Sequence, residues 1–277
     1  MEEELFDALH AHAERHWWFR SRQRIVRKLL DRHFGVRVVH PDAMVLDLGC
    51  GAGTNLRFLE RYGRVSGADP SPKALDYCRQ RFNGPLAEVW LPDQLPYGEK
   101  SFDLVVMLDV LEHVENDIGA LQRVLRLLKP GGTLLLTVPA LRWLWSYHDI
   151  EHHHFRRYHR GALRRKLTRL GFEVSIVSYI NFFLLPLMAS ARMLLRPKNW
   201  SAKDLASGVG VVGRVFEPVF SFERHILGFG TLPIGGSLVA VVRRPPNLEL
   251  PPWTKGLALP TRAESKRLHT DLEQSGK

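Results

Sequence analysis

The most restrictive feature of the sequence is a short apolar run that ends in closely spaced glycines. Residues 43–48 read Ala-Met-Val-Leu-Asp-Leu, and residues 49–53 read Gly-Cys-Gly-Ala-Gly. The run predicts a buried parallel strand, and the glycines predict a tight turn into a following helix. Because glycines let the backbone approach a ligand and a helix N-terminus offers unpaired N–H groups, this pattern is typical of a nucleotide-binding turn. The glycines alone do not choose between a dinucleotide and another cofactor.

Strands and helices alternate along much of the remaining chain. Apolar runs predict further strands near residues 65–69, 86–90, 101–107, 133–138, 172–177 and 237–242. Between them the pattern predicts helices near residues 54–62, 72–82, 117–128 and 160–170, and a turn at 129–132. Alternation at this spacing predicts an α/β fold whose parallel sheet is covered by helices on both faces.

The chain divides into three parts by composition. Residues 1–40 predict an N-terminal helical cap, because residues 14–34 contain few helix breakers. Residues 41–244 predict the α/β domain, with an apolar and aromatic helical insertion at about 180–236, before the last strand. Residues 245–277 are rich in proline and then in charged residues, so we expect a flexible tail.

The net charge and the number of cysteines indicate which classes of partner and which cellular compartment to expect. The net charge of +10 favours an anionic partner such as a phosphorylated metabolite, nucleic acid or an acidic membrane surface. Only two cysteines are present, Cys50 and Cys78, and we expect both to be reduced thiols in a cytoplasmic protein. Residues 1–4 are Met-Glu-Glu-Glu, which is not the start of a signal peptide. The longest uncharged run, residues 174–191, contains Pro186, so we expect no transmembrane helix.

Acidic residues near the turn separate the two cofactor classes. Asp47 stands two residues before the first glycine, where a dinucleotide site usually carries an apolar residue. A carboxylate at that position suits a cationic ligand with an amino group. Asp69 ends the second strand, where an acid bonds ribose hydroxyls in either class. Downstream, residues 95–97 read Leu-Pro-Tyr, 109–113 read Asp-Val-Leu-Glu-His and 128–132 read Leu-Lys-Pro-Gly-Gly.

In this order and spacing, the motifs resemble the class I S-adenosylmethionine-dependent methyltransferases, especially the small-molecule group that includes quinone-biosynthesis enzymes. The resemblance covers about residues 41–140. It implies a Rossmann-like, seven-stranded, mostly parallel sheet whose last strand is antiparallel, and S-adenosylmethionine as cofactor. It implies that the following residues bind the cofactor: Asp47, Gly49, Cys50, Gly51, Gly53, Asp69, Pro70, Ser71, Asp93 and Asp109. Among these, Asp93 matches the family's adenine-binding acid only approximately.

Two histidine-bearing segments follow strands and should lie at the reactive end of the sheet. Methyl transfer requires mainly proximity and a dry pocket, and a base only where the acceptor loses a proton. Residues 149–158 also resemble the D-x4-H-x-R-R-Y pattern of a bacterial subgroup whose members often carry a His-Trp-Trp-Phe element, here residues 16–19. The candidate catalytic residues are His113, His154 and Asp149. The candidate acceptor-binding residues are His148, Arg156, Arg157, Tyr158 and Trp17.

The histidine-rich segment also permits a metal site. Its candidate ligands would be His148, Asp149, His152, His153 and His154. Three consecutive histidines cannot all face one point, and cysteine ligands are absent from the segment. We therefore expect a hydrogen-bonded substrate lid and no metal.

The predicted function is methyl transfer to a small or lipid-linked, anionic acceptor, at oxygen rather than nitrogen or carbon. Seven positive charges within residues 156–169 favour phosphate docking, or else form a solvated helix face. The insertion at 180–236 favours contact with the inner membrane face, or else a lid or a homodimer surface. The alternatives are a non-catalytic S-adenosylmethionine-binding protein and an RNA methyltransferase. Nucleic acid is disfavoured, because the sequence contains no recognisable RNA-binding module.

Overall fold

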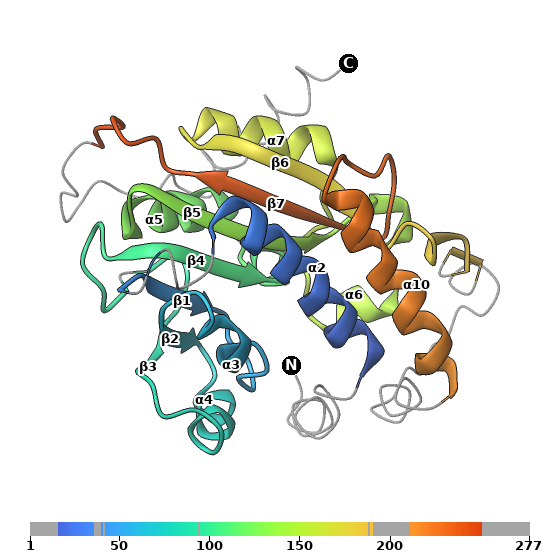
Figure 1. Ribbon diagram of the computed structural model, residues 1–277, viewed down its shortest axis with the longest axis horizontal. Coiled ribbons are helices and arrows are strands. Elements are labelled where there is room, and N and C mark those ends of the chain that lie inside the picture. The colour runs from blue at the N-terminus through green and yellow to red at the C-terminus, as the bar shows by residue number, and fades with distance from the viewer. Residues whose placement is uncertain are drawn as a thin grey trace.

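A seven-stranded sheet lies at the centre of the computed structural model, which describes residues 16–35, 40, 42–93, 95–187, 189–190 and 211–250 (Figure 1). The strands are β1 (Met44–Leu48), β2 (Arg64–Asp69), β3 (Leu86–Glu88), β4 (Phe102–Leu108), β5 (Leu128–Pro139), β6 (Glu173–Ile180) and β7 (Ser237–Arg243). They are ordered β3-β2-β1-β4-β5-β7-β6, and β7 is antiparallel to both of its neighbours. The predicted Rossmann-like sheet with one antiparallel strand is therefore confirmed.

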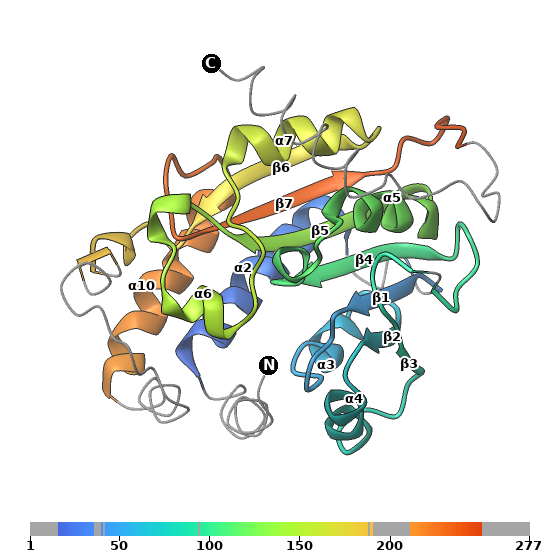
Figure 2. The same ribbon diagram turned by 180° about the vertical axis from the view of Figure 1, so that it is seen from behind.

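Helices cover both faces of the sheet and bury its alternate side chains. One face carries α2 (Trp17–His33), α3 (Leu56–Leu59), α4 (Pro72–Arg79) and α10 (Val211–Leu227) (Figure 1). The other carries α5 (Asp117–Leu127), α7 (Arg160–Arg169) and a loop that contains α6 (Tyr147–Glu151) (Figure 2). In β4, Leu104 and Val106 pack into the core under α2 and α10. Val105 and Met107 point to the other face and pack into the core under α5 and α7.

The described part of the insertion forms α10, which packs along α2. Glu217 of α10 pairs with Arg20 and Arg24 of α2 at 3.3 Å and 2.6 Å. The rings of Trp18 and Phe220 stack with centroids 4.9 Å apart. The N-terminal helix and the insertion, nearly 200 residues apart in the chain, thus form one layer over the sheet.

Several predicted boundaries were wrong. Residues 129–132, expected to form a turn, belong to β5, because a bulge lets the strand pair Phe102 with Leu128 and then Leu104 with Thr133. The helix expected at 54–62 is a single turn, Leu56–Leu59. The chain then turns towards β2 through Gly63, where a Cβ would lie 2.1 Å from the carbonyl oxygen of Ala43.

The remaining segment predictions fall partly outside the described residues. These are residues 1–15 and 36–39 of the cap, 188 and 191–210 of the insertion, and 251–277 of the tail. Within the described residues, none of the helices combines the length and the apolar character needed to cross a lipid bilayer.

Candidate active site

The loops after β1, β2, β4 and β5 meet at the carboxyl edge of the sheet. The strands before them are parallel and hydrogen-bonded in the order β2-β1-β4-β5. In open α/β sheets this edge is where ligands bind. The glycine turn follows β1, Asp69 ends β2, Asp109 follows β4, and the histidine-bearing loop follows β5.

The three glycines of the turn have left-handed backbone angles, but for different reasons. A Cβ on Gly49 would lie 2.3 Å from Cγ2 of Val110, and one on Gly53 would lie 3.0 Å from Sγ of Cys78. Those two glycines are required by packing within the protein. A Cβ on Gly51 would meet no described heavy atom within 4 Å. Gly51 thus faces open space, where a ligand can approach the backbone.

Asp47 is a buried carboxylate without a hydrogen-bond partner in the described part of the chain. Neither of its side-chain oxygens accepts a hydrogen bond from a described residue, and the side chain is fully buried. Burial raises the pKa of Asp47 to about 7, with Arg22 opposing the rise and Asp69 adding to it. Because unpaired buried carboxylates are costly, an ammonium group from a ligand would be strongly favoured here.

Asp69 organises the turn and keeps acceptor capacity for a ligand. Its Oδ2 accepts from the backbone N–H of Gly51 at 2.8 Å, and its Oδ1 accepts from that of Ser71 at 3.0 Å. Burial raises the pKa of Asp69, and these two hydrogen bonds oppose the rise. Each carboxylate oxygen can accept a second bond, so ribose hydroxyls fit this position.

The other residues predicted to bind the cofactor differ in burial and in the contacts that they make. Cys50 is buried with its Sγ 3.8 Å from that of Cys78, and both are free thiols. Ser71, which follows Pro70, caps α4 by accepting from the backbone N–H of Ala74. Asp93 is exposed in the turn after β3, and its adenine contact stays a prediction.

Arg22 of α2 is a site residue that the sequence analysis missed. Its guanidinium pairs with Oδ2 of Asp109, whose Oδ1 accepts from the hydroxyl of Thr137 at 2.8 Å. Arg22 is buried, and its Nε has no hydrogen-bond partner among the described residues. A buried cation with an unused donor fits a ligand carboxylate. The sequence feature that could have identified Arg22 is its position on the buried apolar stripe of α2, which continues through Ile25 and Leu29.

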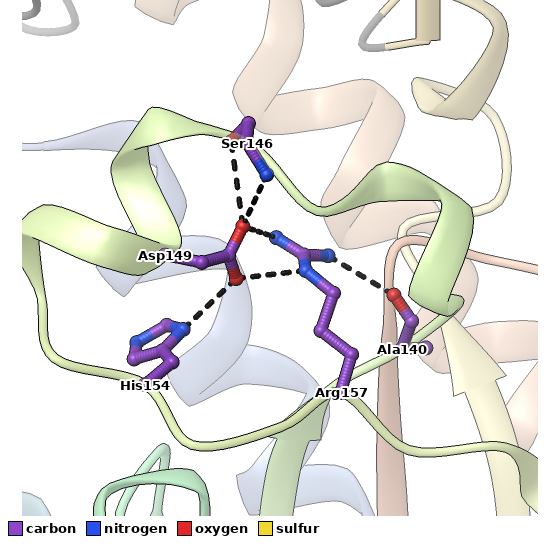
Figure 3. Close-up of polar contacts among 5 residues, drawn as sticks. All are labelled: Ala140, Ser146, Asp149, His154 and Arg157. Carbon is purple, nitrogen blue, oxygen red and sulfur yellow. Dashed lines mark hydrogen bonds and ion pairs between the residues drawn. The ribbon is translucent and has the colours of Figure 1, made fainter.

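The loop after β5 is organised around Asp149 (Figure 3). Arg157 donates to both carboxylate oxygens through Nε and Nη2, at 2.7 Å and 2.9 Å. Nδ1 of His154 lies 3.0 Å from Oδ1, and the backbone N–H of Ser146 donates to Oδ2 at 2.9 Å. Although burial alone would raise the pKa of Asp149, hydrogen bonds with His154 and Arg157 hold it well below its usual range.

Asp117 holds the end of the same loop against the helices beneath it. It accepts from the hydroxyl of Tyr158 at 2.9 Å and pairs with Lys166 and Arg156. Tyr158, Arg157 and Lys166 are buried. The acceptor contacts predicted for Arg156, Arg157 and Tyr158 remain predictions, but the bonds that these residues make fit a positioning role for the loop.

The predicted histidines come together on the two loops that follow β4 and β5. The ring centroids of His113 and His154 are 4.7 Å apart, and those of His148 and His154 are 6.3 Å apart. Partial burial and the nearby His154 lower the pKa of His113 to about 4, and the same causes lower that of His152 to about 4. His113 and His152 are therefore neutral near pH 7, although the side chain of His113 is exposed overall.

Glu112 and Trp17 flank the residues described above on two different elements, the turn after β4 and α2. Glu112 is buried beside Asp109, and its Oε2 lacks a partner among the described residues. Burial and Asp109 raise its pKa well above the usual range. Trp17, predicted to bind the acceptor, packs against Phe216 and Phe220 of α10, and that acceptor contact also stays a prediction.

Comparisons with known proteins agree with this geometry. The family model described as a methyltransferase domain matches residues 15–176, which is more than half of the chain. A probable S-adenosylmethionine-dependent methyltransferase of Mycolicibacterium smegmatis is 29% identical over 58% of this chain and 62% of its own length. A demethylmenaquinone methyltransferase of Tropheryma whipplei is 39% identical over 33% of this chain and 40% of its own. A ubiquinone biosynthesis O-methyltransferase of Xanthomonas campestris is 32% identical over 38% and 46%.

These matches cover less than two thirds of each relative's length. Among solved structures, a chain of the complex between the Haloferax volcanii Trm112 methyltransferase activator and a candidate methyltransferase has a similar fold. Its TM-score is 0.57 at 22% identity, over 88% of this chain and 98% of that one. The matched family and the sheet order lead to one conclusion: the chain belongs to the methyltransferase domain family and carries a domain of the class I S-adenosylmethionine-dependent type.

Proposed function

We propose that the protein methylates a hydroxyl group of a small or lipid-linked acceptor, bound at the rim formed by His113 and His154. The observation that carries this proposal is the His154–Asp149 pair, fixed by Arg157 at the same edge of the sheet as the glycine turn. A histidine oriented by a buried carboxylate is suited to remove a proton from a hydroxyl near neutral pH.

The residues on the cofactor side would bind and orient S-adenosylmethionine. Asp47 would pair with its ammonium group and Arg22 with its carboxylate, while Asp69 would accept from the ribose hydroxyls. When bound, S-adenosylmethionine supplies a methyl group on a positively charged sulfur, which leaves as a neutral thioether. The chain then has to align the acceptor oxygen and exclude water.

On the acceptor side, Nδ1 of His154 is bonded to Asp149, which leaves Nε2 for the acceptor. His154 would accept the hydroxyl proton as the oxygen attacks the methyl carbon. Asp149 does not need to take up the proton, because its bonds to Arg157 and Ser146 favour the charged carboxylate. His113 is 4.7 Å from His154 between ring centroids and would help to position the acceptor.

Exposed aromatic side chains around this rim support an apolar acceptor. The loop that carries His154 exposes Trp143, Trp145, Tyr147, Ile150 and Phe155. Clustered exposed apolar side chains often mark ligand or membrane contact. Two relatives act on quinone-related compounds by name, and one of them is an O-methyltransferase. The net charge of +10 further favours an anionic acceptor or an acidic membrane surface nearby.

The test is transfer of a radiolabelled methyl group from S-adenosylmethionine into fractionated cell extracts. We expect label in the lipid or small-molecule fraction, lost with Asp69→Asn and strongly reduced with His154→Ala. The variant His153→Asn is the matched control, because His153 is exposed beside the site and its φ of 54° is tolerated by asparagine.

Other outcomes would point to the alternatives. Cofactor binding without label in any fraction would indicate a non-catalytic binding protein. Label that is lost after ribonuclease treatment would indicate an RNA methyltransferase. Full activity of His154→Ala would remove His154 as the base.

A further inference from the structure

Glu112, His113 and His154 are arranged as a ligand set for a metal ion. Within the described ranges, they are the one group of histidine, cysteine, aspartate or glutamate side chains whose donor atoms converge, all within 4.8 Å of one another. Glu112 and His113 belong to a short 3-10 turn (Leu111–His113) after β4, and His154 belongs to the loop after β5. The backbone N–H of Phe155 donates to the carbonyl oxygen of Glu112 at 2.8 Å, which holds the two loops together.

The carboxylate of this group is the strongest indication of a ligand. Glu112 is 1% exposed, and its Oε2 has no hydrogen-bond partner among the described residues. Buried carboxylates in native proteins are almost always hydrogen-bonded, paired or bound to a cation. An ion between Glu112 and the two imidazoles would satisfy this oxygen.

His154 is held as metal-binding histidines usually are. Its Nδ1 bonds to the carboxylate of Asp149, so its Nε2 is the nitrogen left for an ion (Figure 3). A carboxylate behind a histidine ligand fixes the orientation of the ring and increases its basicity. Nε and Nη2 of Arg157 and the backbone N–H of Ser146 hold Asp149 in turn, so the residues behind His154 are also fixed by hydrogen bonds.

We propose that Glu112, His113 and His154 bind a divalent transition-metal ion, with Zn²⁺ as the best match to two imidazole nitrogens and one carboxylate oxygen. Bonds of about 2.0–2.2 Å to zinc would place the donors roughly 3–4 Å apart, so the group has to contract by only about 1 Å. Three protein ligands leave a fourth position for an exchangeable molecule. Mg²⁺ and Ca²⁺ fit poorly, because they prefer oxygen ligands.

This set differs from the one that the sequence suggested. Asp149 was a candidate ligand from the sequence, but both of its carboxylate oxygens are bonded to Arg157, Ser146 and His154. His148 and His152 lie against each other with ring centroids 4.1 Å apart, beside the group and not in it. The ligand that the sequence analysis lacked is Glu112, because a glutamate in an apolar turn after a strand does not by itself indicate a metal.

The role of the ion rests on the proposed methylation of a hydroxyl group, whereas its binding does not. With the ion bound, Nε2 of His154 is a ligand, so the ion replaces His154 in activating the acceptor hydroxyl. A bound divalent ion would coordinate the acceptor hydroxyl and lower its pKa. The O–H bond would break with the proton passing to solvent or to a nearby base, and the oxygen would form the bond to carbon as the carbon–sulfur bond breaks. The electron pair of that bond would stay on the thioether sulfur, so no oxidant or reductant is required.

The test is direct metal binding by the full chain without a polyhistidine tag. After removal of metals with a chelator, Zn²⁺ is titrated in competition with a chromophoric chelator, and Co²⁺ is used as a spectroscopic probe. We expect one ion per chain and a visible Co²⁺ spectrum typical of nitrogen and oxygen ligands. Zinc affinity should fall at least about 10-fold in Glu112→Gln and in His154→Ala, and should not change in His153→Asn.

Folding and cofactor binding serve as controls. Each variant is checked by thermal unfolding and by calorimetric titration with S-adenosylmethionine. If Glu112→Gln does not fold, His113→Ala gives an independent result, because His113 is exposed. Equal zinc affinity in the wild type, His113→Ala and His154→Ala would overturn the metal site. Zinc binding without methyl transfer to any extract would instead contradict the proposed function and leave the metal site standing.

Discussion

At the scale of single residues, the site contains buried charged side chains whose hydrogen-bonding atoms are not all used within the protein. Among the residues that the structure describes, none bonds to the buried carboxylate oxygens of Asp47 or to the Nε of the buried Arg22. Such groups cost stability in the free protein and gain it when a ligand pairs with them. S-adenosylmethionine carries both an ammonium and a carboxylate, so its binding should stabilise the fold.

The first prediction concerns the pH dependence caused by Asp47. Its pKa is about 7 in the folded protein against a usual value of 3.8. Below pH 4 the carboxyl is protonated in both states, and between pH 4 and 7 only the unfolded state ionises. Its contribution therefore destabilises the protein increasingly as the pH rises to 7, by up to ~4 kcal/mol.

Asp47→Asn removes this titration. Urea unfolding at pH 5 and pH 8 should show that the variant loses less stability than the wild type over that interval. Its affinity for S-adenosylmethionine should fall by ~10- to 100-fold, the effect of losing one hydrogen bond to a charged group. An identical pH dependence in the two proteins would contradict the assignment.

The second prediction separates two glycines of the turn. Ala at position 49 would clash with Val110 and adopt a left-handed backbone, so Gly49→Ala should lose about 2–5 kcal/mol of unfolding free energy. Ala at position 51 meets no described atom and adds only backbone strain of about 1 kcal/mol. Gly51→Ala should therefore fold, but bind S-adenosylmethionine at least ~10-fold more weakly. Equal stability losses in the two variants would show that Gly51 is also a packing residue.

At the scale of elements, the sequence predicted the strands better than the side-chain contacts. Apolar runs such as residues 101–107 and 237–242 give strand positions because a parallel sheet buries both faces of each strand. Five arginines lie in α2, and only the stripe shared with Ile25 and Leu29 distinguishes Arg22. The Asp117 cluster could not be predicted, because it joins the start of α5 to two side chains about 40 and 50 residues later.

The third prediction concerns this cluster, which joins α5, α7 and the loop after β5. Asp117→Asn would leave Lys166 and part of Arg156 buried without a full counter-charge. We expect a loss of about 3–5 kcal/mol in unfolding free energy, measured by urea denaturation. The matched control is Asp76→Asn, which removes an exposed ion pair with Arg79 and should cost less than ~1 kcal/mol. Similar losses of unfolding free energy in the two variants would show that the buried Asp117 cluster stabilises the fold no more than an exposed ion pair does.

At the scale of the whole molecule, two exposed apolar surfaces lie at the same end of the fold. One is the aromatic part of the loop around α6, and the other is the outer face of α10, formed by Val215, Val219 and Phe222 and continued by Phe229. The two lie on opposite sides of the sheet and both flank the carboxyl edge (Figures 1 and 2). We propose that this end rests on an acidic membrane surface, from which a lipid-linked acceptor would reach His154.

The last prediction tests that proposal by co-sedimentation with lipid vesicles. Apolar side chains such as Phe229, which is 94% exposed, would insert at the headgroup level, and the net charge of +10 would attract anionic lipid. We expect binding to vesicles that contain anionic lipid, weakened by added salt because exposed charges are screened. The double variant Phe222→Ser/Phe229→Ser should bind at least ~10-fold less, since each aromatic ring that is kept fully out of water contributes about 1.5–3 kcal/mol and partial insertion contributes a fraction of this. Trp90→Ser is the control, because Trp90 is 60% exposed but follows β3, the edge strand farthest from β6, whereas Glu223 of α10 contacts Asn181 at the end of β6. Equal binding by all three proteins, or none at low salt, would mean that the acceptor reaches the site from solution and that the α10 face has another role.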